Sequence, residues 1–133
     1  MIRNLIFILA LMFSLGASAK KDQYTKVYMF GMATAFTDSV VVMTDIQAID
    51  SAFVTAKNFL PERSIYSYQL ESFFEVKKGK PGTTVAVIWG TDRKRVEKDF
   101  LKIRRRFMSD KTTKLESLTT EEFKFQRVEH YAE

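Results

Sequence analysis

Three runs of apolar residues constrain the fold of this chain more than any other feature. They are Lys26–Phe36 (KVYMFGMATAF), Val40–Ile49 (VVVMTDIQAI) and Thr83–Trp89 (TTVAVIW). The first two are apolar at consecutive rather than strictly alternating positions, which is typical of strands covered on more than one side. The third is short, continuous and apolar, and it predicts a central strand.

The segments around these runs predict turns, a connection and a last strand. Thr37–Ser39 separates the first two runs and predicts a β-hairpin. Gly31, inside the first run, indicates a bulge or a close backbone contact. Residues 50–59 have no clear period and predict a connection. Residues 122–131 begin with alternating apolar and polar side chains and predict a final strand.

Two segments have helical periodicity. In the first, Pro61 suits the opening turn, and the segment ends before Gly79–Gly82 (GKPG). Its apolar positions at i, i+4 and i+7 are Tyr66, Leu70 and Phe73.

The second helix, over residues 92–108, is basic, and Thr91 or Asp92 can cap its start. Its apolar stripe at i, i+4, i+7 and i+11 faces a sheet. The stripe consists of Val96, Phe100, Ile103 and Phe107.

The element order β-β-α-β-α-β predicts an α+β fold, a small mixed β-sheet with two helices packed on it. The simplest arrangement has both helices on one face of the sheet. We expect residues 20–133 to form a single domain, because a chain of this length builds one ordinary core.

The first nineteen residues predict export. Arg3 precedes an apolar stretch, Leu5–Leu15, and the small residues Ala17–Ala19 follow. This layout resembles that of bacterial secretory signal peptides, and the stretch is too short for the ~20 residues of a transmembrane helix. The chain has no cysteine and Lys20 follows the expected cleavage point, which argues against a lipoprotein. We therefore expect a periplasmic or secreted protein.

The inventory of reactive side chains argues against most enzymatic chemistries. With one histidine and no cysteine, the chain lacks the usual ligands of zinc. His130 is expected to be an exposed imidazole beside Glu129, with no catalytic role. Asp45 and Asp50 lack the glycine and glutamate of a calcium loop. No catalytic residue, metal site or cofactor is therefore predicted.

Charge is concentrated in the basic helix. Between Arg93 and Lys114 there are ten basic and three acidic residues, a local net charge of 10 − 3 = +7. A basic ridge of this kind suits nucleic acid, a membrane surface, a solvated surface or an anionic partner. The apolar stripe is needed to cover the sheet, which argues against a membrane surface. The export signal argues against nucleic acid. The predicted ridge consists of Lys94, Lys98, Lys102 and Arg105, which lie opposite the apolar stripe, together with Arg106 to one side.

Two further sites follow from the helices. Basic residues occupy the first turn of the basic helix, where acidic ones are favoured. Either the fold tolerates this misfit, or the free N–H groups of that turn form an anion site. Its residues would be Thr91, Asp92, Arg93 and Arg95, with an Arg95–Asp99 ion pair beside it. In the first helix Tyr66 and Tyr68 point about 200° apart, so Tyr68 should lie at the surface as a candidate interface aromatic.

These features favour an exported, non-enzymatic binding module. Its expected partner is an anionic ligand, an envelope polymer or an acidic protein that contacts the basic helix. The alternative function is a small periplasmic or secreted hydrolase with an unrecognised site.

Overall fold

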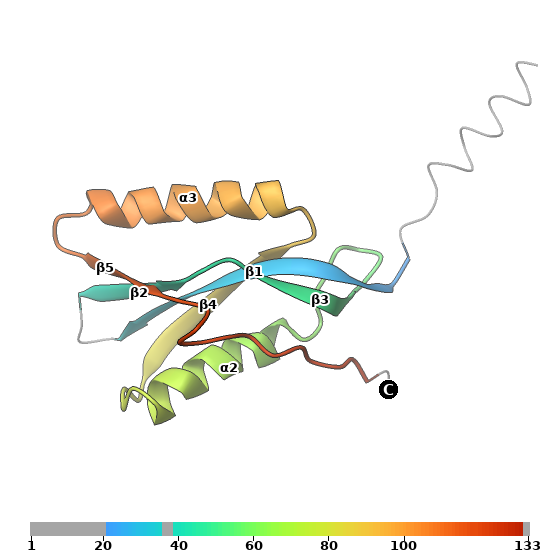
Figure 1. The fold of residues 1–133 in the computed structure, drawn as a ribbon, viewed down its shortest axis with the longest axis horizontal. Coiled ribbons are helices and arrows are strands. Elements are labelled where there is room, and N and C mark those ends of the chain that lie inside the picture. The colour runs from blue at the N-terminus through green and yellow to red at the C-terminus, as the bar shows by residue number, and fades with distance from the viewer. Residues whose placement is uncertain (1–20, 36–38, 132–133) are drawn as a thin grey trace, which may run out of the picture.

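The computed structural model describes residues 21–35 and 39–131. The predicted signal segment, residues 1–19, and most of the predicted hairpin turn lie outside the described residues. The described part forms one mixed five-stranded sheet and two helices (Figure 1). In chain order the elements are β1 (Gln23–Ala35), β2 (Val40–Thr44), β3 (Gln47–Val54), α2 (Arg63–Val76), β4 (Thr83–Gly90), α3 (Arg93–Ser109) and β5 (Lys114–Leu118).

Strand β1 is the centre of the sheet. It pairs antiparallel with β3 near its start, with β2 near its end and with β4 from Tyr28 to Ala35. Because β4 overlaps both β2 and β3 along β1, β4 must lie on the opposite edge of β1 from those two strands. Strand β5 then pairs with β2 in parallel, from Val40 opposite Lys114. The small mixed sheet and the α+β class are as the sequence predicts.

The two helices lie on opposite faces of the sheet, with α3 above it and α2 below it in Figure 1. The expectation that both would share one face is therefore wrong. Alternate residues of β1 show the reason: Val27 and Met29 join the core cluster under α2, whereas Phe30 joins the cluster under α3. A strand with helices on both faces must be apolar at consecutive positions, as β1 is.

Helix α2 begins two residues after Pro61, with Glu62 at the N-cap position. It buries Tyr66, Leu70 and Phe74 against the sheet. A Cβ on Gly31 of β1 would clash with the Leu70 side chain, so this glycine is the close backbone contact that the sequence suggested. The helix ends before Gly79, which adopts a positive φ of 62°.

Helix α3 agrees closely with the sequence prediction. The Asp92 side chain caps it by accepting a hydrogen bond from the Lys94 N–H. Val96 is buried, and the rest of the apolar stripe packs around Phe30 of β1. The Phe30 and Phe100 rings meet edge to face, with centroids 5.1 Å apart.

Three strand predictions need correction. Within the described residues β4 pairs with β1 alone and is therefore an edge strand; its apolar run reflects helices on both faces rather than a central place. The predicted connection after Ile49 is instead the second half of β3, which pairs with β1 as far as Val54. The strand that follows α3 is β5, whereas residues 122–131 form no strand.

Residues 119–131, the C-terminal segment, run across the α2 side of the sheet (Figure 1). Phe123 and Phe125 are buried there, so the alternation of apolar and polar residues correctly predicted which side chains are buried. Their backbone groups, however, bond to a glutamine side chain rather than to a neighbouring strand. Alternation alone cannot distinguish a strand that pairs with a neighbouring strand from a segment whose backbone bonds to a side chain.

Candidate functional site

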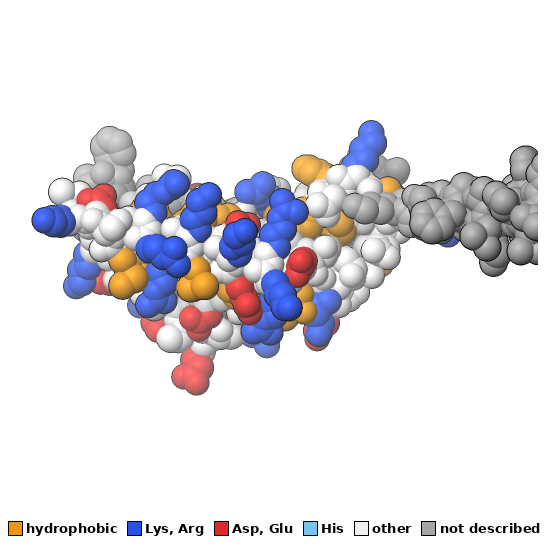
Figure 2. Space-filling model, turned by 90° about the horizontal axis from the view of Figure 1, so that it is seen from above, with side chains coloured by type: hydrophobic (Ala, Val, Ile, Leu, Met, Phe, Trp, Pro, Cys, Tyr) orange, Lys and Arg blue, Asp and Glu red, His pale blue; other side chains and the backbone are white. Residues whose placement is uncertain are grey.

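The outward side of α3 carries a basic face, which we define as the five residues of the predicted ridge. The first four recur every three or four positions, Arg106 follows directly after Arg105, and all five are exposed. Lys and Arg side chains gather over this helix in Figure 2. The basic face consists of Lys94, Lys98, Lys102, Arg105 and Arg106.

Few of the positive charges on α3 are neutralised by ion pairs. Arg93 pairs with Glu97 at 2.9 Å, one turn along the helix, and its guanidinium lies 5.8 Å from the centre of the Tyr28 ring. Over the part of the chain that the structure describes, no residue of the basic face forms an ion pair. The expected Arg95–Asp99 pair does not form there either. The basic face therefore presents uncompensated charge to the solvent.

Three of the four residues of the predicted anion site line one hollow, and Arg93 is the exception. A hollow of about 270 Å³ lies at the start of α3, and Thr91, Asp92 and Arg95 line it together with Asp99. Two carboxylates thus face one guanidinium, and the Asp92 carboxylate already accepts the Lys94 N–H. Arg93 is not among the residues that line the hollow, because its side chain lies over Tyr28 and Glu97. The anion site stays a prediction.

A second polar arrangement, which the sequence did not reveal, holds the C-terminal segment in place. The Gln47 side chain on β3 donates to the Phe123 carbonyl at 2.9 Å and accepts from the Phe125 N–H at 2.8 Å. Gln69 on α2 makes the same pair of bonds, both at 2.8 Å, with the N–H and carbonyl of Gln126. Each glutamine therefore satisfies a donor and an acceptor of the segment, as a neighbouring strand would.

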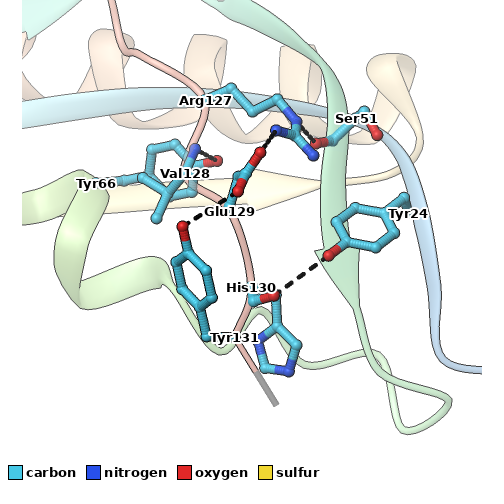
Figure 3. A network of polar contacts seen from close by, with 8 residues as sticks. All are labelled: Tyr24, Ser51, Tyr66, Arg127, Val128, Glu129, His130 and Tyr131. Carbon is cyan, nitrogen blue, oxygen red and sulfur yellow. Dashed lines mark hydrogen bonds and ion pairs between the residues drawn. The ribbon is translucent and has the colours of Figure 1, made fainter.

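Further contacts extend this network toward residue 131 (Figure 3). The Val128 N–H donates to the Tyr66 hydroxyl at 3.1 Å, and the Arg127 guanidinium donates to the Ser51 carbonyl. The pKa of Tyr66 is raised, chiefly because burial disfavours the phenolate, with a smaller contribution from the nearby Glu62. Tyr66 therefore acts as a neutral acceptor within the core.

His130 is only 22% exposed, and its place differs from the one expected of it. Its imidazole stacks on Phe53 and its Nδ1 lies 2.5 Å from Oε1 of Glu62 at the start of α2. The partner is thus Glu62 rather than Glu129, whose carboxylate contacts Arg127. Helix periodicity places Glu62 next to Tyr66 on the inward side of α2, a signal that could have identified it.

Aromatic side chains lie beside the Glu62–His130 pair. The His130 ring stacks on Phe53, and the Glu62 carboxylate is close enough to Tyr66 to help raise the pKa of its hydroxyl. The pair holds the C-terminal segment against α2.

Tyr68 is 64% exposed while Tyr66 is fully buried, as the helix geometry predicts. Tyr68 lines a groove of about 450 Å³ between α2 and the C-terminal segment. The floor of this groove is apolar and includes Phe73 and Phe123. Tyr68 therefore borders a concave surface rather than standing alone.

The aspartates weighed as metal ligands have other partners. Asp45 lies between β2 and β3 and accepts from the Thr120 N–H at 3.2 Å. Asp50 is 3.6 Å from the Lys26 ammonium. Across residues 21–35 and 39–131, no three His, Cys, Asp or Glu side chains come close enough to hold a metal ion. Neither helix of this part of the chain is long and apolar enough to cross a bilayer.

Comparisons of the chain with protein-family models, with curated proteins and with solved structures found no match. A functional interpretation therefore depends on the basic face and on the groove beside Tyr68.

Proposed function

We propose that this protein is an exported, non-enzymatic binding module that contacts an anionic polymer or an acidic protein through the basic face of α3. The observation that carries the proposal is the exposure of all five basic-face residues without an ion pair among the described residues. Repulsion between like charges one turn apart destabilises a helix. An anionic partner would relieve that repulsion and release the counterions around it.

The fold supports separate roles for the two sides of α3. The apolar stripe of α3 is occupied by the sheet, so the basic face is free to contact a partner without loss of the core. A helix that instead inserted into a membrane would have to expose Val96, which is only 1% exposed. Polyanion binding requires no such rearrangement.

Titration with linear polyphosphate at several salt concentrations tests the proposal. We expect binding that weakens as ionic strength rises, because salt screens exposed charges. Replacing Lys98, Lys102 and Arg105 by Gln should weaken binding at least tenfold. The control replaces Lys21, Lys57 and Lys111, which are exposed and lie outside α3 and outside the groove beside Tyr68, by Gln and removes the same net charge. Equal losses in both variants would show that overall charge alone attracts the polymer and would refute a dedicated face.

Export needs a separate measurement. The intact mass of the protein from an exporting host should correspond to a chain that begins at Lys20, because cleavage is expected after Ala19. A full-length product retained in the cytoplasm would contradict export and would reopen nucleic acid as the anionic partner.

A further inference from the structure

A second surface lies on the side of the sheet away from α3. It is the groove between α2 and the C-terminal segment, which we call the α2 groove. Its residues are Tyr68, Gln69, Ser72, Phe73, Val76, Lys77, Phe123, Lys124 and Gln126.

The α2 groove is apolar inside and basic at its rim. Tyr68 is 64% exposed and Val76 77% exposed, so two large side chains border it without being covered. Phe73 is half-buried and Phe123 is 8% exposed, and they supply aromatic surface. The charged residues that line the groove are Lys77 and Lys124, with no carboxylate among the lining residues. An occupant of opposite charge would therefore be acidic as well as apolar.

Backbone groups of the C-terminal segment make the groove suitable for a peptide. In an extended chain, a residue directs its N–H and C=O to one side, and its neighbours direct theirs to the other. The Phe123 carbonyl and the Phe125 N–H bond to Gln47, whereas both groups of Gln126 bond to Gln69 on α2. The N–H and C=O of Lys124 therefore point to the Gln69 side, where the groove lies.

These two groups of Lys124 have no hydrogen-bond partner within the described residues. Ser72, which also lines the groove, provides a hydroxyl. A donor and an acceptor side by side match the peptide group of another extended chain. An acyl chain offers neither. A peptide thus satisfies polar groups that a lipid would leave unpaired.

We propose that the α2 groove binds an acidic, extended segment of a partner protein, with an aromatic or large aliphatic side chain against Tyr68 and Phe73. The segment's backbone pairs with Lys124 and its carboxylates lie near Lys77 and Lys124. This site is separate from the basic face and does not depend on the function proposed for it.

The test is a titration of the ¹⁵N-labelled protein with the acetylated and amidated peptide Glu-Asp-Phe-Asp-Glu, followed by NMR. We expect the largest shifts at the Lys124 backbone amide and the Gln69 side-chain amide. Replacing the peptide's Phe by Gly should weaken binding at least tenfold, because the apolar contact is lost. Shifts confined to α3 would overturn the proposal, as would affinities equal for the two peptides.

Charge-reversed variants test whether the lysines of the groove contribute to peptide binding. Lys77→Glu with Lys124→Glu should weaken binding of the Phe peptide at least tenfold. Lys21→Glu with Lys57→Glu makes the same charge change at exposed positions outside both the groove and α3, and it should leave binding within about twofold. If the two variants behave alike, the groove is not the site. Sodium decanoate tests whether the groove binds a lipid instead. If decanoate shifts the same amide signals at a lower concentration than the peptide does, the proposal that the ligand is a peptide is overturned.

Discussion

The imidazole of His130 lies flat on the ring of Phe53, with 3.9 Å between the ring centroids and 2° between their planes. The stack joins the end of the C-terminal segment to β3, and the Glu62 contact joins the same ring to α2. One side chain thus holds the end of the chain against β3 and the start of α2, both of which are distant from it in sequence.

Replacing His130 by Ala should destabilise the protein by about 1–3 kcal/mol, because the buried Glu62 carboxylate would lose its partner. Its Oε2 atom already has none within the described residues. Urea unfolding measures the loss, and hydrogen exchange should show faster exchange at Val128. Tyr131→Ala is the control, since Tyr131 is 80% exposed and should change stability by less than ~0.5 kcal/mol. Equal effects of the two variants would mean that the Glu62 contact contributes nothing.

The two glutamines that hold the C-terminal segment should differ in importance. Gln47 is 5% exposed and its bonds to Phe123 and Phe125 are buried, whereas the bonds of Gln69 are exposed to water. Gln47→Leu should therefore cost about 2–3 kcal/mol and Gln69→Leu about 1 kcal/mol or less. Denaturant unfolding of both variants measures the difference. A larger cost for Gln69→Leu would contradict this ranking.

Acid should weaken the turn between α3 and β5. Hydrogen bonds from the Thr112 hydroxyl and N–H, and from the Thr113 hydroxyl, hold the pKa of Asp110 below its usual value. A carboxyl with a lowered folded-state pKa stabilises the fold above its unfolded pKa, roughly 4, and this contribution is lost as pH falls through the folded value. Asp110→Asn should thus lose less stability than the wild type between pH 6 and pH 3. Urea unfolding at several pH values measures the free energy of unfolding of both proteins. If it falls by the same amount in both between pH 6 and pH 3, the prediction is refuted.

Gly31→Ala should destabilise the protein by about 1–3 kcal/mol, because the new methyl group would clash with the Leu70 side chain. Leu70→Ala removes the obstacle but leaves a cavity that costs about 2–5 kcal/mol. The double variant should therefore lose less stability than the two single losses added together. Strict additivity in denaturant unfolding would show that α2 does not depend on this close approach.

Much of the fold follows from local patterns in the sequence. The four-residue stripe of α3 and its Asp92 cap were predictable, because a surface helix needs one apolar side and an end that is capped. The consecutive apolar residues of β1 indicated that both faces of the sheet are covered. The prediction that both helices lie on one face did not take this pattern into account, and the structure contradicts that prediction.

The contacts of the C-terminal segment could not be predicted in the same way. Gln47 and Phe125 are 78 residues apart, and a polar residue in a strand does not reveal that its amide will bond to a distant backbone. His130 shows the same difficulty, since its nearest acid in sequence is Glu129 but its partner in space is Glu62. Alternation near Phe123 predicted burial correctly and the backbone pairing incorrectly.

The placement of α2 and α3 on opposite faces has a consequence for how ligands would combine. A polymer on α3 and a peptide beside α2 would be separated by the whole thickness of the sheet, so neither would block the other. A partner that carries both chemistries, joined by a linker long enough to pass around the sheet edge, would gain from a high effective concentration at its second site. If the polymer and the peptide belonged to two separate partners, this protein would instead bridge them as an adaptor.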